Sequence, residues 1–222
     1  MPQQHRVKQG ECLTEIASKY GFASWQSLWD APGNKKLREK RREPNVLFPG
    51  DLIEIPDRHT KLEPIASGMK HRFQRHMPMK LLRLQLKDPT NESRFSNRSY
   101  TLKLQKPGGA MGDVVEVEGD LDDTGKLEKE IPIDTHEGTL VIEFEDSIFN
   151  LPLLIDHLDP VDENTGIQAR LNNLGFHCGK VDGHIGPRTR EALRLFQASK
   201  SFDTTGVADA NTREALRTDH GS

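Results

Sequence analysis

GHIGPRTREALR, from Gly183 to Arg194, and GVADANTREALR, from Gly206 to Arg217, end in the same six residues, TREALR. The copies lie 23 positions apart, and each begins six positions after a glycine. A period of this length indicates a repeated supersecondary unit. Gly186-Pro187 before the first copy and Asp209 before the second are helix-start signals. A helix is therefore predicted to begin three residues before the threonine of each copy.

Another amphipathic helix is predicted just upstream of this repeat. Ile167, Leu171 and Leu174 lie on one helical face, and Gly175 ends the pattern. Asp-Gly and Thr-Gly turns separate the predicted helices between residues 164 and 218. The sequence therefore predicts a small C-terminal three-helix bundle.

The same region resembles the peptidoglycan-binding domain 1 family, a three-helix cell-wall module. The resemblance rests on GKVDGHIGPRT (179–189), on Ala192-Leu193 and Phe196-Gln197, and on the echo TGVADANT (205–212) with Ala215-Leu216. It implies binding of cell-wall glycan or of the peptide stem. The candidate contacts that it implies are Asp182, Gly183, His184 and Arg188.

The N-terminal region has a pattern of its own. HRV (5–7) is predicted to be a strand, and the apolar spacing that follows predicts a helix up to Gly21. Ser24 is a cap for a second helix, and LIEI (52–55) after the turn at Pro49-Gly50 is predicted to be the closing strand. The predicted order is strand, helix, helix, strand.

This βααβ order resembles the LysM domain, which binds glycans containing N-acetylglucosamine. The matching residues are VKQGECL (7–13), Ile16-Ala17, Tyr20-Gly21 and the segment NVLFPGDLIEIP (45–56). The resemblance implies a shallow sugar groove between the loop after the first strand and the loop before the last. Its candidate residues are Gly10, Glu11, Cys12, Leu13, Asn45, Val46, Leu47, Phe48 and Pro49.

Two features depart from the LysM pattern. Cys12 stands where a serine or threonine is usual, which removes a hydroxyl from the sugar-facing loop. The stretch NKKLREKRREPN (34–45) is long and basic for a connection, with six basic residues against Glu39 and Glu43. It is either a solvated helix face beside the groove or a contact for phosphates or acidic partners.

From Met79 the hydrophobic period changes to two. Alternating runs separated by Gly-, Asp- and Pro-containing turns predict six or seven short strands, and hence an antiparallel β-sandwich similar to transthyretin-like or immunoglobulin-like domains. LDDTGKL (121–127) lacks EF-hand spacing and is interpreted as a hairpin turn. The predicted multidomain α+β chain comprises a LysM-like module (1–57), a connector (58–78), a β spacer (79–160) and a peptidoglycan-binding domain (161–222).

Composition and motifs exclude several classes of function. With 34% hydrophobic residues, the 222-residue chain favours several small domains, and a net charge of −3 gives no bulk attraction to nucleic acid or acidic membranes. No apolar run is long enough to span a membrane, and the opening MPQQHRVKQGE has no signal-peptide core. Cys12 and Cys178 have no zinc or CxxC spacing and are expected to be reduced thiols.

No catalytic set of residues emerges from the sequence. HEGTL (136–140) lacks the second histidine of a zinc protease, and SGMK (67–70) lacks the partners of an SxxK enzyme. His177-Cys178 beside Asp182 and His184 suggests a Cys/His pair, but the surrounding peptidase pattern is missing. We expect no cofactor, no metal and no enzymatic activity.

These expectations combine into a non-catalytic peptidoglycan-binding protein with a binding module at each end, tethered for avidity. Because peptidoglycan lies outside the cytoplasm, the chain would need delivery without a signal peptide. Its architecture resembles proteins associated with type VI secretion and related contractile injection spikes. The alternative is a structural or adaptor protein of such a machine, whose LysM-like module binds a spike or baseplate protein through the basic stretch. A third hypothesis is a hydrolase whose chemistry lies in the middle domain.

Overall fold

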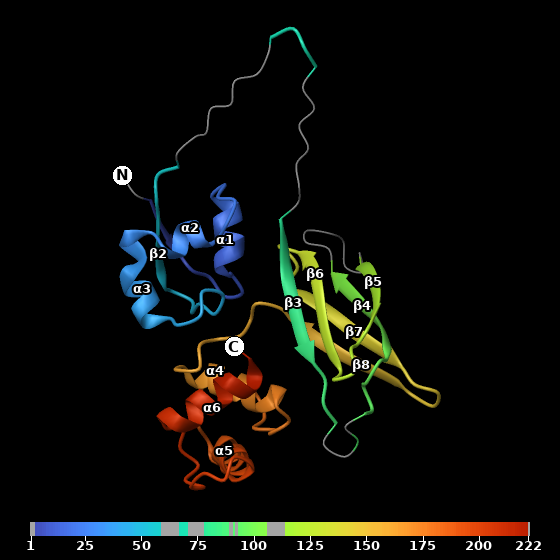
Figure 1. Ribbon diagram of the computed structural model, residues 1–222. Helices are drawn as coiled ribbons and strands as arrows, with labels where there is room; N and C mark the ends of the chain where they lie inside the picture. Colours follow the sequence, from blue (N-terminus) through green and yellow to red (C-terminus); the bar gives the residue numbers. More distant parts are fainter. Residues whose placement is uncertain are drawn as a thin grey trace. The chain divides into compact units, whose positions relative to one another are not determined.

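The computed structural model describes residues 3–58, 67–70, 78–88, 91, 93–105 and 114–221 (Figure 1). The chain divides into two compact units. The first contains Thr14–Ser27 and Pro56–Ile155, and the second contains Pro2–Leu13, Leu28–Ile55 and Asp156–Ser222. The predicted division into two terminal modules and a β spacer stays a prediction. Most of the predicted connector, 58–78, lies outside the described residues.

The N-terminal strand β1 (Gln3–Arg6) pairs antiparallel with β2 (Leu52–Ile55), in a register from Gln3↔Ile55 to Arg6↔Leu52. The pairing continues past the strands, because Val7 N donates to Asp51 O at 2.9 Å and Gly50 N donates to Val7 O at 2.8 Å. The second strand has its predicted bounds. The first begins two residues before the predicted 5–7.

Between these strands the chain forms α1 (Leu13–Lys19), α2 (Gln26–Trp29), the 3-10 helix η1 (Pro32–Asn34) and α3 (Lys35–Lys40). The predicted strand–helix–helix–strand order therefore omitted a helix, which lies in the basic stretch. The buried Asn34 side chain fixes its start: Nδ2 donates to Leu28 O at 2.8 Å and to Glu54 O at 2.7 Å, and Oδ1 accepts from Glu54 N at 2.7 Å.

The middle region consists of the strands β3 (Met79–Gln85), β4 (Ser99–Gln105), β5 (Val114–Asp120), β6 (Lys126–Pro132), β7 (Glu137–Glu143) and β8 (Ile148–Leu154). They form antiparallel sheets of order β3-β6 and β5-β4-β7-β8, whose strands are labelled in Figure 1. Alternate side chains of both sheets enter one hydrophobic core, which explains the period of two in the sequence. The buried members are Phe95, Tyr100, Leu102, Leu104, Leu121, Leu127, Ile131, Leu140, Ile142, Leu153 and Ile155.

The turn at LDDTGKL connects different sheets. Asp122 Oδ1 accepts from Thr124 N and Lys126 N, both at 2.8 Å, which gives the tight turn that the sequence predicts. The flanking strands β5 and β6 do not pair with each other, however, because β5 pairs with β4 and β6 pairs with β3. The interpretation of this segment as a hairpin was therefore wrong, since local turn chemistry does not determine strand partners.

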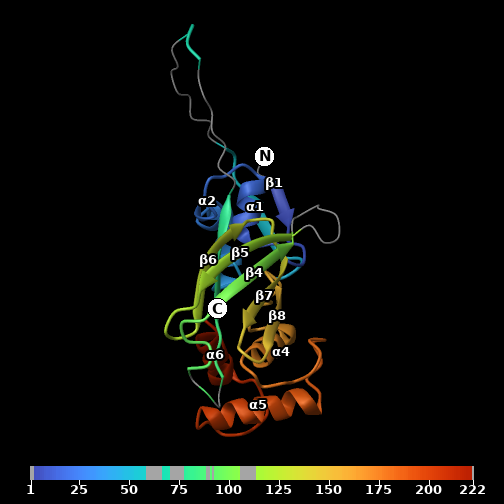
Figure 2. The ribbon, with the colours of Figure 1, turned by 90° about the vertical axis from the view of Figure 1, so that its right-hand side faces the viewer.

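The C-terminal region contains α4 (Asn164–Asn173), α5 (Pro187–Ser199) and α6 (Ala210–His220), and α5 is seen end-on in Figure 1 and along its length in Figure 2. Both helices of the repeat begin where the sequence predicts, after Gly186 and after Asp209, whose side chain accepts from Thr212 N at 2.8 Å. Their apolar faces enclose a common core. Its buried residues are Ile167, Leu171, Cys178, Ala192, Leu193, Phe196 and Leu216.

None of the helices in the described part of the chain has the length and apolar character needed to cross a membrane.

Candidate functional site

The first glycine turn of the repeat is held by one buried glutamine. Gln168, on α4, is 1% exposed, and its Oε1 accepts from Asp182 N at 3.1 Å and from Gly183 N at 2.7 Å. Its Nε2 donates to Asp182 Oδ1 at 3.0 Å, to His184 O at 3.1 Å and to Thr189 Oγ1 at 3.3 Å. One side chain thus joins α4, the turn and the first helical turn of α5.

The second turn repeats this arrangement one helix later. Gln197, on α5, is also 1% exposed, and its Oε1 accepts from Gly206 N at 2.9 Å. Its Nε2 donates to Thr205 Oγ1 at 3.2 Å, to Val207 O at 2.9 Å and to Thr212 Oγ1 at 3.1 Å. The helix that precedes each turn therefore supplies the glutamine that fixes it.

These contacts explain why TREALR occurs twice. Its first residue, Thr189 or Thr212, is buried and receives a hydrogen bond from the glutamine. Its leucine, Leu193 or Leu216, is completely buried in the common core. Gly183 and Gly206 have φ values of +79° and +72°, a conformation that favours glycine. The repeat is thus a duplicated structural unit.

The candidate binding residues lie on the outer side of the first turn. Asp182, His184 and Arg188 are exposed, while Gly183 is half-buried. Hydrogen bonds from the Gln168 side chain and from His184 N lower the pKa of Asp182, which keeps the carboxylate charged. A carboxylate and an imidazole are thus presented on a rigid turn, and a guanidinium is presented at the start of α5. Such groups can hydrogen-bond to sugar hydroxyls, amides or carboxylates.

The N-terminal candidate residues are less accessible. Cys12, Leu13 and Leu47 are 2%, 0% and 6% exposed, so their side chains belong to the interior rather than to a sugar-facing surface. Gly10 is also buried, and a side-chain carbon built at this glycine would lie 3.2 Å from His157 Nε2.

The remaining N-terminal candidates are Glu11, Asn45, Val46, Phe48 and Pro49. Glu11 is half-buried, and its Oε2 lies 2.8 Å from His5 Nε2 and accepts from Lys8 N at 2.9 Å. Asn45 is exposed, and the other three are half-buried. Sequence reasoning thus located the loops, but assigned to sugar contact several side chains that the fold buries.

A buried ion pair supports the loop before β2, and the sequence analysis missed it. Arg41 Nε donates to Asp51 Oδ2 at 2.8 Å and Nη2 to Oδ1 at 3.2 Å, with both side chains 2% exposed. Phe48 N also donates to Asp51 Oδ2, at 3.0 Å, and the Arg41 guanidinium lies 5.5 Å from the centre of the Phe48 ring. Burial opposes ionisation of Asp51, but the hydrogen bonds from Arg41 and Lys40 outweigh it, so the pKa is lowered.

The Cys178 thiol has a structural environment. Its Sγ donates to Gln168 O at 3.4 Å and to Asn172 Oδ1 at 3.3 Å, and the side chain is 4% exposed. Burial raises the pKa of this thiol, which disfavours the thiolate that a nucleophile needs. Among the described residues, no three or more His, Cys, Asp or Glu side chains cluster in a way that could hold a metal ion.

Comparison with known proteins bears on this same region. Residues 164–216 match the family described as "Putative peptidoglycan binding domain". The matched segment contains Gln168, Gln197 and both glycine turns. The sequence prediction of a peptidoglycan-binding domain here is therefore confirmed.

Similar proteins share this segment alone. N-acetylmuramoyl-L-alanine amidase CwlM of Mycobacterium tuberculosis is 38% identical over 55 residues, which is 25% of this chain and 14% of that protein. Spore cortex-lytic enzyme of Oceanobacillus iheyensis is 44% identical over 50 residues, 22% of this chain and 18% of that enzyme. The enzyme of the same name from Bacillus cereus is also 44% identical over 50 residues, which is 19% of its length. The chain thus spans less than a fifth of each of these relatives, and it matches no solved structure.

Proposed function

We propose that this protein binds peptidoglycan, without cleaving it, through the first glycine turn of its C-terminal domain. The observation that supports this proposal is the buried Gln168 network, which fixes the turn that carries Asp182 and His184, next to Arg188 at the start of α5, inside the matched segment. A preformed site loses less conformational entropy on binding than a mobile one. These exposed groups are the proposed contacts to a wall sugar or to the peptide stem.

The test is co-sedimentation of the full chain with purified, insoluble peptidoglycan sacculi. The double variant His184→Ala, Arg188→Ala is expected to lose at least about ten-fold in affinity, since two hydrogen-bonding side chains are removed. Arg194→Ala is the matched control, because Arg194 is also exposed on α5 but is paired with Glu191 at 3.1 Å. Equal binding by the double variant and wild type would show that the wall contacts lie elsewhere.

We further propose that the N-terminal region adds a second, weaker glycan contact. Its support is the resemblance to LysM and the accessibility of Asn45, Phe48 and Pro49 beside the paired strands. The variant Asn45→Ala, Phe48→Ala should lower sacculus binding several-fold, because a tethered second contact raises the effective concentration of the first. Unchanged binding by this folded double variant would confine recognition to the C-terminal domain.

The absence of catalysis is also part of the proposal. The named relatives are lytic enzymes, but the shared segment is the binding domain alone. Cys178 is the cysteine nearest to the candidate site, and its buried, hydrogen-bonded thiol is unsuited to attack. We expect sacculi incubated with the protein to release no muropeptides above a heat-treated sample. Release that disappears in Cys178→Ala would establish a hydrolase.

The proposed site of action is the cell wall, reached through a contractile injection apparatus such as type VI secretion. This part of the proposal rests on the resemblance of the whole architecture to such proteins. Its test is co-purification of the tagged chain with isolated apparatus. Failure of the chain to co-purify, with sacculus binding intact, would separate wall binding from this route of delivery.

A further inference from the structure

The basic segment Lys35–Glu43 lies beside the C-terminal domain within the second unit. Arg42 Nη1 lies 3.4 Å from Glu214 Oε2, and Arg217 Nη1 lies 3.1 Å from Glu43 Oε1. The buried Arg41 also points toward this domain, with Nη2 3.5 Å from Glu163 Oε1. Glu163 is the residue that precedes α4.

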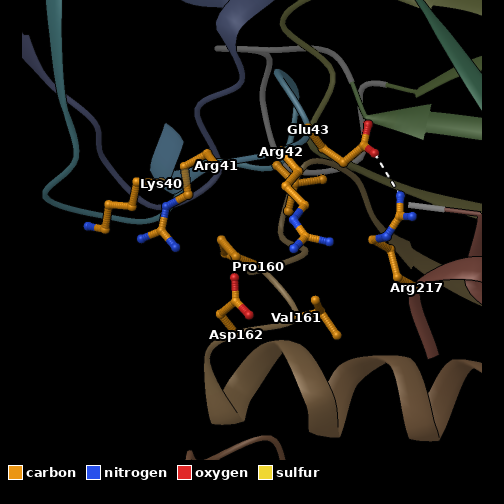
Figure 3. Close-up of a pocket in the computed structure, with 9 residues that line it drawn as sticks. Lys40, Arg41, Arg42, Glu43, Pro160, Val161, Asp162 and Arg217 are labelled. Atoms are coloured by element: carbon orange, nitrogen blue, oxygen red, sulfur yellow. Dashed lines mark hydrogen bonds and ion pairs between the residues drawn. The ribbon is translucent and has the colours of Figure 1, made fainter. Parts of the chain in front are cut away.

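A small pocket lies between the two segments. Figure 3 shows Lys40, Arg41, Arg42 and Glu43 facing Pro160, Val161, Asp162 and Arg217 across it, with the pair Glu43–Arg217 marked. Its volume of about 30 Å³ holds little more than a water molecule or two. A sugar ring needs far more room, so the two surfaces pack against each other rather than enclosing a ligand.

The charged side chains on these surfaces form pairs of opposite sign. Segment 35–43 contains six basic residues, yet most of them have an acidic or carbonyl partner in this chain. Lys35 lies 3.8 Å from Glu39, and Lys40 lies 2.9 Å from Asp51. Arg38 Nη1 donates to Ala31 O at 3.0 Å and also to Trp29 O. Five of the six basic residues therefore have a partner within the described part of this chain.

We propose that segment 35–43 is an internal docking surface whose partner is the C-terminal peptidoglycan-binding domain. The term docking face denotes Arg41, Arg42 and Glu43 together with Glu163, Glu214 and Arg217. Charge complementarity selects this partner, and the bidentate Arg41–Asp51 pair gives the face a rigid centre. Docking makes the N-terminal strands and the C-terminal helices one body, so that wall contacts on both are held at a fixed separation.

The test measures the distance between the two parts in the free protein, without any wall material. Nitroxide labels are attached to cysteines introduced at Lys36 and Ala198, which are exposed positions on α3 and α5. The native Cys12 and Cys178 are 2% and 4% exposed and so are protected from labelling. Electron paramagnetic resonance of the labelled full chain should give one narrow distance distribution at low salt.

Charge reversal should release the docking. Glu43→Arg places like charges opposite Arg217 and should replace the narrow peak by a broad distribution, as should 1 M salt, where the Debye length is about 3 Å. Glu39→Arg is the matched control, because it is the same substitution in the same basic segment, at a residue that faces Lys35 instead of the C-terminal domain. Its distribution should stay narrow.

A complete inversion of the exposed pairs provides the rescue. The variant Arg42→Glu, Glu43→Arg, Glu214→Arg, Arg217→Glu keeps every pair with opposite sign and should restore the narrow peak. A broad distribution in the wild type, no difference between Glu43→Arg and Glu39→Arg, or no restoration by the inverted variant would each overturn the proposal. Because no peptidoglycan is present, these outcomes are independent of whether the protein binds the wall.

Discussion

Replacing Gln168 by leucine should unfold the first turn without changing the size of the core. Leucine fills similar space but makes none of the hydrogen bonds to Asp182, Gly183, His184 and Thr189. Water can reach the exposed Asp182 and His184 groups, whereas Thr189 is 2% exposed and keeps only a long hydrogen bond to His184 O, at 3.4 Å. With roughly 1–1.5 kcal/mol for each uncompensated hydrogen bond, the expected loss of stability is about 2–4 kcal/mol.

The decisive assay is amide hydrogen exchange, because the Gly183 N–H is bonded directly to Gln168 Oε1. Its protection should be lost in Gln168→Leu, and the thermal midpoint of the C-terminal region should fall by roughly 10–20 °C. Gln197→Leu is the matched variant: it should lose protection at Gly206 but keep it at Gly183. Gln26→Leu, at an exposed position, should change neither.

This reasoning also predicts a difference in wall binding. Gln168→Leu should weaken sacculus binding more than Gln197→Leu, because only the first turn holds the proposed contacts. Full protection of Gly183 together with an unchanged thermal midpoint in Gln168→Leu would refute the structural role assigned to the glutamine.

Three further outcomes are expected. Gly206→Ala should lower the free energy of unfolding by about 1–3 kcal/mol in a denaturant titration, because φ is +72° and the added carbon would lie 3.1 Å from a backbone oxygen. Gly186→Ala, with open space around the added carbon, should leave that free energy unchanged. Burial lowers the pKa of His220 from 6.5 to about 4, so between these pH values the unfolded chain binds a proton that the folded chain does not. The thermal midpoint should therefore fall as the pH drops from about 6.5 to 4. The variant His220→Gln should remove that fall. Asp51→Ala should lower the free energy of unfolding by about 3–5 kcal/mol, because it leaves Arg41 buried without the Asp51 carboxylate. In the wild type, acid should weaken this pair only below about pH 4, because the pKa of Asp51 is lowered and the carboxylate takes up its proton there.

The C-terminal fold was predictable because its signals are local. Gly186-Pro187 and Asp209 start their helices through caps that lie within one turn of the sequence. The strands of the middle region were predictable for the same reason, since alternation needs only neighbouring residues. Which strands pair is a long-range property, and this is why β5 and β6 were wrongly joined as a hairpin.

The candidate sites were predicted less well than the fold. The resemblance indicated the loops around Gly10 and Asn45, but a sequence does not tell whether Leu13 faces the interior or the surface, and here it is completely buried. Arg41 was expected either on a solvated helix face or in contact with phosphates or acidic partners, whereas Asp51, ten positions later, makes it part of a buried ion pair. The available signal in the sequence was Asp51, directly after the Pro49-Gly50 turn. Its role as the partner of Arg41 can be recognised only once the pairing of β1 with β2 is known.

The antiparallel pairing of β1 with β2 has a consequence for how the chain folds. Gln3 pairs with Ile55, so the first strand cannot find its partner until nearly the whole N-terminal region has been synthesised. In the C-terminal region, the hydrogen bond of a turn glutamine with the largest sequence separation joins Gln168 to Thr189. Contacts between residues this close in the sequence form rapidly. On a ribosome the N-terminal strand therefore emerges first and waits, whereas the helices at the other end can form almost as soon as they appear. Of these two parts, the N-terminal pair is thus expected to fold more slowly, and β3 and β6 face the same constraint, because Met79 pairs with the distant Pro132.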